Sequence, residues 1–246
     1  MEKNDYIFGT RAILEALEAG KTIDKIYIKR DAGGDIIKEL TERAKYYDVP
    51  VQRVPLEKLN RITLKNHQGC IAILSPVTYY KLENLIPQLY EEGKNPFCVI
   101  LDNVTDTRNF GAIARTAECA GANFIVIGEK NSVSVTSDAV KASAGALFHL
   151  PVCREKNITE AVRILQSSGY KVFGASEKSS EDYTKADFKS PVAIVMGAED
   201  KGISYDVLRL CDDLVAIPIK GNIGSLNVSV AAGVIMYEIV RQRKDI

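Results

Sequence analysis

Short apolar runs without a polar face constrain the fold of this chain more than any other feature of its sequence. Five of them, FCVILDNV, NFIVIGE, KVFGASE, VAIVMGAE and DLVAIPI, follow one another between residues 97 and 219, and the segments between them can form helices. Strands that are buried on both faces are typical of a mostly parallel sheet with helices on each side. The sequence therefore predicts an α/β fold for this part of the chain.

The residues before position 77 predict a second, smaller α/β domain. Helices are expected over residues 9–20 and 34–48, and strands over residues 24–30, 49–55 and 69–76. The first helix is followed by a glycine, the residue that most often comes directly after a helix end.

A segment bounded by prolines separates the two parts. Pro76 and Pro96 enclose residues with the pattern of one short helix, and domain boundaries usually fall in linkers of this kind. We therefore expect a domain over residues 1–76, a linker over residues 77–95 and a second domain over residues 96–246.

Composition disfavours several classes of protein. Apolar residues make up 46% of the chain and charged residues 26%, as in ordinary soluble proteins, and no apolar run approaches the roughly 18 residues of a membrane span. The N-terminus, MEKNDYIFGT, is too polar for a secretory signal, so we expect a cytoplasmic protein with no membrane segment. The 5 cysteines form no C-x-x-C pair and there are only 2 histidines, which argues against a disulfide framework and against a metal site.

Three of the predicted strands end in polar loops that contain glycine. TDTRNFG follows the first strand and includes Asn109, which is expected to cap the next helix; AEDKGIS, with Glu199, follows the fourth strand; KGNIGSLN follows the fifth. In parallel α/β sheets, ligands bind just beyond the C-terminal ends of the strands. The three loops together predict one ligand site at this edge of the sheet.

The last of these loops leads into an apolar helix in an unusual way. Gly221 and Gly224 precede Ser225, Leu226 and Asn227, and the helical spacing of apolar residues begins only after them. Ser225 is expected to be the N-cap of the helix. Asn227 then falls inside a helix that otherwise looks buried, where an amide needs hydrogen-bond partners. Capping alone does not explain it, which favours a binding role for the loop.

The residues by themselves do not identify the ligand. The sequence has no G-x-G-x-x-G after a first strand, no G-x-x-x-x-G-K-[ST] and no G-x-S-x-G, which disfavours a Rossmann dinucleotide site, a P-loop and a nucleophile elbow. What remains is an α/β ligand site that carries Arg, Asn, Glu and Ser side chains.

Three motifs of the second domain resemble those of a known family. NFGAIARTAECAGA, VMGAEDKGIS and IPIKGNIGSLNVSVAAG occur in this order and are similar to the three signature motifs of the SpoU (TrmH) family of RNA ribose methyltransferases, in the SPOUT superfamily. FGTRAILEAL and NHQGCIAI, near the two ends of the first domain, resemble the RNA-binding domain of that family, which is of the ribosomal L30e type. The whole pattern is most similar to the RlmB branch, which methylates a guanosine ribose in large-subunit ribosomal RNA.

This resemblance implies a fold, a cofactor and a partner. The second domain is expected to form a trefoil knot whose loops hold S-adenosylmethionine, and to pair with a second copy as a homodimer. The resemblance places the cofactor against five residues: Gly197, Ile217, Gly221, Leu226 and Asn227.

The resemblance also implies the catalytic residues. They are Asn109, Arg115, Glu199, Ser225 and Asn227, and Arg115 is expected to stabilise the ribose oxygen as it loses its proton, in its own subunit or its neighbour's. RNA binding is expected in the first domain through polar and basic side chains, namely Arg11, Arg61, Lys65, His67 and Gln68. One departure is Asp200, where many family members have glycine.

Other functions fit parts of this pattern. The same chemistry on transfer RNA is a close alternative, although the transfer RNA enzymes usually carry basic terminal extensions in place of this first domain. A non-catalytic RNA-binding or ribosome-assembly protein on the same fold is a second alternative, which the intact catalytic set disfavours. A nicotinamide dehydrogenase would need the glycine fingerprint that this chain lacks.

Overall fold

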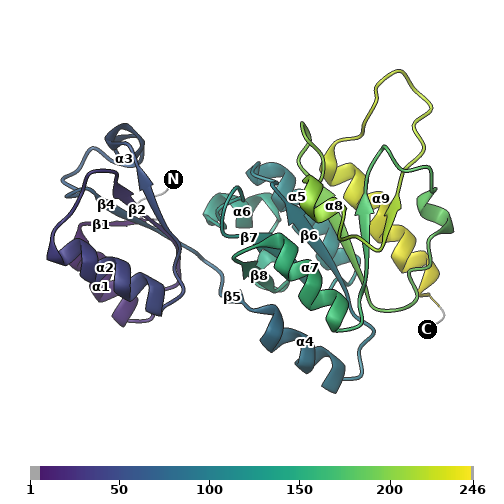
Figure 1. Cartoon of the computed structure of the whole chain (residues 1–246), viewed down its shortest axis with the longest axis horizontal. Helices are drawn as coiled ribbons and strands as arrows, with labels where there is room; N and C mark the ends of the chain where they lie inside the picture. Colours follow the sequence, from purple (N-terminus) through teal and green to yellow (C-terminus); the bar gives the residue numbers. More distant parts are fainter. Residues whose placement is uncertain (1–5, 245–246) are drawn as a thin grey trace. The chain divides into compact units, whose positions relative to one another are not determined.

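The chain divides into two compact units in the structure, a computed structural model that describes residues 6–244 (Figure 1). The boundary along the chain lies between Thr78 and Tyr79, and the short segment 134–138 groups with the first unit. Each unit has its own buried apolar core, as expected of a domain.

The first unit contains a four-stranded sheet. Its strands are β1 (Tyr6–Phe8), β2 (Ile23–Lys29), β3 (Val51–Val54) and β4 (Cys70–Leu74). They lie in the order β1-β4-β2-β3; β2 pairs parallel with β3, and the other neighbours are antiparallel. The sequence predicted the last three strands but not β1, which is too short to show a period.

Three helices cover this sheet: α1 (Thr10–Glu18), α2 (Asp35–Tyr46) and α3 (Leu56–Ile62). α1 and α2 share one buried cluster with Cys70 and Ala72 of β4, whereas α3 belongs to a second cluster with Ile71 and Ile73. Successive residues of a strand face opposite sides of a sheet. α1 and α2 therefore cover one face and α3, which the sequence did not predict, covers the other.

The second unit is built on a seven-stranded sheet in which every pairing is parallel. The strand order is β11-β9-β10-β6-β7-β8-β5. The strands are β5 (Tyr79–Tyr80), β6 (Phe97–Asp102), β7 (Phe124–Gly128), β8 (Val152–Glu155), β9 (Lys171–Ala175), β10 (Val192–Gly197) and β11 (Asp213–Val215). β6, β7 and β10 are buried along their whole length, which explains their apolar sequences and confirms the predicted α/β fold.

Helices lie on both faces of this sheet. They are α4 (Leu82–Glu91), α5 (Thr107–Cys119), α6 (Ser137–Ala142), α7 (Ile158–Ser167), α8 (Tyr205–Leu208) and α9 (Val228–Gln242). α4, α7 and α8 share one core cluster with Cys98 and Ile100 of β6, whereas α5 packs against α9 and β7, and α9 also packs on β10.

The segment predicted to be a linker forms part of the second unit. β5 pairs with β8, and α4 places Leu82, Leu85, Ile86 and Leu89 in the core. This apolar spacing is that of a packed helix, but the flanking prolines and Pro87 inside the helix gave the segment the appearance of a connector.

The end of α9 is fastened to the connection between β9 and β10. Gln242 donates to the carbonyl of Ala186 and accepts from the backbone N–H of Phe188, each at 2.9 Å. The guanidinium of Arg243 donates to the carbonyl of Phe188 at 2.8 Å and to that of Asn95 at 2.7 Å. The last turn of α9 thus holds together chain segments that are far apart in the sequence.

Candidate functional site

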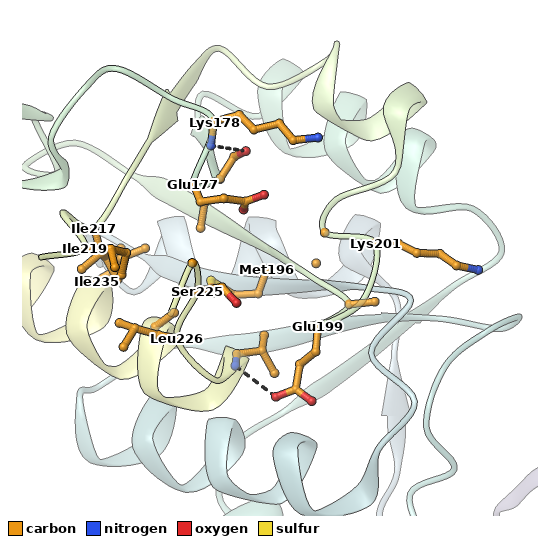
Figure 2. Close-up of a pocket in the computed structure, with 18 of the residues that line it drawn as sticks. Glu177, Lys178, Met196, Glu199, Lys201, Ile217, Ile219, Ser225, Leu226 and Ile235 are labelled. Carbon is orange, nitrogen blue, oxygen red and sulfur yellow. Dashed lines mark hydrogen bonds between the residues drawn. The ribbon is translucent and has the colours of Figure 1, made fainter. Parts of the chain in front are cut away.

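A pocket of about 390 Å³ lies at the C-terminal edge of the parallel sheet (Figure 2). Ala175, Gly197 and Val215, the last residues of β9, β10 and β11, contribute to its wall, and the rest comes from the loops after these strands and from α9. Pockets for small molecules have volumes of roughly 300–1,000 Å³. The position matches the ligand site that the sequence predicted at this edge.

The pocket has an apolar side, and its charged side chains lie at separate places on the rest of the wall. Ile217, Ile235 and Leu226 gather on one side, whereas Glu177 and Glu199 come from other parts of the wall (Figure 2). This combination suits a ligand with an apolar ring system and polar ends.

Gly197 is required by a close approach of the backbone. A Cβ atom at this position would lie 2.1 Å from the carbonyl carbon of Gly202, so no other residue fits. The loop after β10 turns back over Gly197, and it is closed by hydrogen bonds from the N–H of Ala198 to the carbonyl of Gly202 at 3.1 Å and in the reverse direction at 2.7 Å. The turn places Glu199 at the pocket wall.

One amide joins the three predicted motifs. The side-chain nitrogen of Asn227 donates to Oδ1 of Asn109 at 3.0 Å and to Oε1 of Glu199, and its oxygen accepts from the backbone N–H of Ser229 at 2.9 Å. Asn109 lies in the first turn of α5, Glu199 follows β10, and Asn227 directly precedes α9. Residues from three distant parts of the sequence therefore meet beside the pocket.

Two capping predictions are wrong. α9 begins at Val228 with Asn227 as its N-cap, so Ser225 does not cap it and Asn227 is exposed rather than buried inside the helix. α5 is capped by Asp106, whose side chain accepts from two backbone N–H groups of the first turn. The side chain of Asn109 is consequently available to bond with Asn227.

Most of the residues predicted to bind the cofactor do meet at this pocket. Gly197, Ile217 and Leu226 line it, and so do Glu199 and Ser225 of the predicted catalytic set. Residues of the second and third motifs therefore line the pocket. The first motif is linked to them by the hydrogen bond between Asn109 and Asn227.

Gly221, by contrast, does not line the pocket, although its neighbour Gly224 does. A Cβ atom added at either glycine meets nothing within 4 Å, and neither has a positive φ. The fold of this chain alone therefore does not require glycine at these two positions.

Arg115 lies on α5 away from the pocket. It is exposed and does not line the pocket, and no hydrogen bond or ion pair joins it to another residue within 6–244. It comes six residues after Asn109, which in an α-helix is roughly 9 Å along the axis and about 240° around it. Asn109 faces α9, so Arg115 belongs to a different face of α5.

The part of the pocket wall that follows β9 was not predicted from the sequence. Glu177 and Lys178 line the pocket, and their turn is fixed because the hydroxyl of Ser176 accepts from the N–H of Lys178 at 3.3 Å. The available signal was the same as for the other loops, namely polar residues directly after the buried run KVFGA. No glycine directly follows that strand, and this is why the loop was not predicted to be part of the site.

The residues predicted to bind RNA lie in the first unit, and four of them are exposed: Arg11, Arg61, Lys65 and Gln68. His67 is only 7% exposed. Its Nδ1 accepts from the backbone N–H of Gly69 at 3.1 Å and its Nε2 is 3.0 Å from Oδ1 of Asn60. Both ring nitrogens are thus occupied within the protein, and His67 holds the loop before β4 in place.

Residues 6–244 contain neither a metal site nor a membrane-spanning helix. No group of three or more His, Cys, Asp or Glu side chains there could hold a metal ion, and no helix in that range has the length and apolar character to cross a membrane. Cys70, Cys98 and Cys153 are buried and only Cys119 is classed as exposed. Burial raises the pKa of Cys98 well above its ordinary value, as expected of a core thiol.

The fold and the pocket define an α/β protein that holds a small ligand at the C-terminal edge of a parallel sheet, with a second α/β domain before it. Residues 96–237 match the SpoU rRNA Methylase family, and residues 6–80 match the family described as RNA 2'-O ribose methyltransferase substrate binding. The chain belongs to the SpoU rRNA methylase family, which confirms the resemblance seen in its three motifs.

Relatives and solved structures agree with this family. The chain is 34% identical over 245 residues to YacO of Bacillus subtilis (strain 168), which is named as a TrmH family tRNA/rRNA methyltransferase, and the match covers 100% of this chain and 98% of that one. The AdoMet-bound rRNA methyltransferase from Sinorhizobium meliloti has a TM-score of 0.62 and 27% identity, covering 96% of this chain and 87% of that one. The SpoU methyltransferase AviRb from Streptomyces viridochromogenes, in complex with AdoMet, has a TM-score of 0.60 and 25% identity, covering 96% and 89%.

Proposed function

We propose that this protein methylates a ribose 2′-hydroxyl, that of a guanosine, in large-subunit ribosomal RNA, with S-adenosylmethionine as the methyl donor. The observation that carries the proposal is the contact of Asn227 with both Asn109 and Glu199 beside a pocket of about 390 Å³. These three side chains belong to the predicted catalytic set, and one amide brings them together. Membership of the SpoU family supports the reaction class.

The pocket residues fit S-adenosylmethionine by size and by chemical character. The apolar side formed by Ile217, Leu226 and Ile235 suits an adenine ring, and the charged residues Glu177 and Lys178 suit the ribose hydroxyls and the amino-acid end. When bound, this cofactor supplies a methyl group on a positively charged sulfur. Two of the similar solved structures hold AdoMet.

The protein's own residues have to place the ribose oxygen in line with the methyl group and stabilise the charge that develops on that oxygen. Placement alone can contribute about 7–11 kcal/mol. We assign the charge stabilisation to Arg115, because a guanidinium keeps its proton and donates hydrogen bonds to an oxyanion and to a neighbouring phosphate.

A homodimer is part of the proposal because of where Arg115 lies. Arg115 is exposed on a face of α5 different from that of Asn109, and it does not line the pocket of its own chain. We infer that it serves the pocket of a second copy, as the resemblance to the family implied. Each copy would then be incomplete without the other.

The trefoil knot belongs to the same proposal. After β11, the chain runs through the loop that lines the pocket and enters α9, which packs against α5. The far end of α9 is bonded to Ala186 and Phe188 in the earlier connection between β9 and β10. A late helix that is held by an earlier connection supports the knotted arrangement.

RNA binding is assigned to the first unit. Residues 6–80 match the substrate-binding family, and Arg11, Arg61, Lys65 and Gln68 are exposed there. Side chains of this kind contact phosphates and the edges of unstacked bases in RNA loops. His67 contributes by holding the loop from which Lys65 and Gln68 extend.

Transfer RNA is the second candidate substrate. The relative from Bacillus subtilis is named as a tRNA/rRNA methyltransferase, and the site geometry does not distinguish the two RNAs. The first unit, which matches a ribose methyltransferase substrate-binding family, is the part of the chain that has to make this distinction.

The test measures transfer of a radiolabelled methyl group from S-adenosylmethionine to unmodified large-subunit ribosomal RNA and, in parallel, to transfer RNA. We expect label in the ribosomal RNA and a loss of roughly 10²–10³-fold in rate for Arg115→Ala. Label in transfer RNA alone would overturn the substrate. Cofactor binding without label in either RNA, or full activity of Arg115→Ala, would overturn the catalytic assignment.

A further inference from the structure

A buried carboxylate close to the pocket has no place in the site described so far. Asp102, the last residue of β6, is only 4% exposed, and it neither lines the pocket nor belongs to the predicted set. No lysine, arginine or histidine of the described chain forms an ion pair with it. A buried charge without a cation is costly unless hydrogen bonds stabilise it, so the partners of Asp102 indicate its role.

Those partners come from two different loops. Oδ2 of Asp102 accepts the backbone N–H of Ser204 at 2.6 Å, and Oδ1 accepts the side-chain N–H of Asn103 at 2.8 Å. Asn103 has a φ of 59°, a conformation that asparagine tolerates better than most residues. The carboxylate thus joins the end of β6 to a segment a hundred residues further along the chain.

Ser204 is the point at which the loop after β10 ends, because it is the N-cap of α8. Asp102 and Gly197 are partners in the register of β6 and β10, and the loop leaves from Gly197, folds over it and closes between Ala198 and Gly202. The hydrogen bond from Ser204 to Asp102 holds the C-terminal end of the loop. The loop is therefore anchored to β6 as well as to β10.

This loop carries Glu199, which lines the pocket and accepts a hydrogen bond from Asn227. A small shift of the loop would move the carboxylate of Glu199 relative to the pocket and to Asn227. We propose that Asp102 is a positioning residue for the cofactor site: it holds the loop 198–203 through Ser204, without touching the cofactor, so that Glu199 stays at the pocket wall. This role rests on the proposed function, because it is tested by the binding of S-adenosylmethionine.

The chain offers a control for testing this role, Asp212, which has the same hydrogen-bond pattern as Asp102 but is exposed. Asp212 also accepts one backbone N–H, that of Val172 at 2.7 Å, and one side-chain amide, that of Gln166 at 2.9 Å. It precedes β11 and bonds the start of β9, at the end of the sheet opposite to the pocket. Asp212→Ala therefore removes the same kind of link without touching the loop 198–203.

The experiment measures S-adenosylmethionine binding by calorimetry and thermal unfolding for Asp102→Ala, Asp102→Asn and Asp212→Ala in the full chain. We expect Asp102→Ala to weaken binding roughly 10- to 100-fold, the effect of losing a hydrogen bond to a charged group. Asp102→Asn keeps an oxygen that accepts from Ser204 and should restore most of the affinity. Asp212→Ala should lower the unfolding temperature and leave the affinity unchanged. Equal loss of affinity in both alanine variants, or none in Asp102→Ala, would overturn the proposal.

A second measurement applies if Asp102→Ala does not fold. Hydrogen exchange in the wild-type protein should show the Ser204 amide protected to a similar degree as the amides of β10, and Asp102→Asn should retain this protection. Exchange at the rate of a free loop would overturn the positioning role. If the wild-type protein binds no S-adenosylmethionine, the proposed function fails, and the exchange data still decide whether Asp102 holds the loop.

Discussion

Asn227 performs two tasks that substitution can separate. Its side-chain oxygen caps α9 by accepting from the N–H of Ser229, and its side-chain nitrogen joins Asn109 and Glu199. Asn227→Ala removes both functions. Asn227→Ser keeps an oxygen that caps about as well as asparagine and removes the donor.

The capping function of Asn227 affects mainly the free energy of unfolding, and its donor function affects mainly the reaction rate. Loss of an N-cap lowers the free energy of unfolding by about 1 kcal/mol, which corresponds to a fall of roughly 2–4 °C in the unfolding temperature for a chain of this size. Water can replace the bonds to Glu199 and Asn109, since Glu199 is exposed and Asn109 partly so, so these bonds add little to stability. They fix geometry instead, and a misplacement of about 1 Å can lower a rate roughly 10²-fold.

Urea unfolding and single-turnover methyl transfer to RNA measure the two effects separately. We expect Asn227→Ala to lose both stability and rate, and Asn227→Ser to keep the stability and lose the rate. Full activity of the serine variant would refute the role of the amide donor. An alanine variant as stable as the wild-type protein would refute the capping energy.

Four other predictions concern Gly197, Ala144 and two of the cysteines. Gly197→Ala should abolish S-adenosylmethionine binding in calorimetry because its Cβ would overlap the backbone of the returning loop, whereas Gly33→Ala, in the first unit and with nothing within 4 Å of the added Cβ, should leave binding unchanged. Ala144→Gly should raise the free energy of unfolding by about 1 kcal/mol in urea titration, because Ala144 has a φ of 51°, a region unfavourable for a residue with a Cβ. Burial raises the pKa of Cys211 from 9.0 to about 12; between these values the unfolded state binds fewer protons, so stability should fall as the pH rises above about 9. At pH 8 a thiol reagent should label Cys119 and leave Cys211 unmodified until the protein unfolds.

The parallel sheet was predictable because its central strands are buried on both faces and therefore read as uninterrupted apolar runs. β1, β5 and β8 were not predicted, since 3, 2 and 4 residues are too few to show a clear period. α4 was taken for part of a linker because local signals, the prolines around and inside it, outweighed an apolar spacing whose meaning depends on a core formed by distant strands.

The site was predictable to the extent that it follows strand ends. Glu199 and Asn227 were found because they stand in glycine-containing loops at one edge of the sheet. Which residue caps α9, by contrast, depends on backbone angles within one or two residues, and the sequence favoured Ser225 over Asn227. Asp102 was hidden for a different reason: it ends a buried strand, and its partner Ser204 lies a hundred residues away.

The order in which the chain is made determines when this protein can first bind its cofactor. The pocket needs β9, β10 and β11 and also Ile235 of α9, and α9 is held in place by contacts with the earlier segment around Phe188. On a translating ribosome, the first unit and the central strands β6 and β7 are complete while these parts are still missing. A nascent chain can therefore present its first unit long before it can carry a methyl donor, and, with the proposed pocket as the cofactor site, S-adenosylmethionine can bind only once α9 has been made.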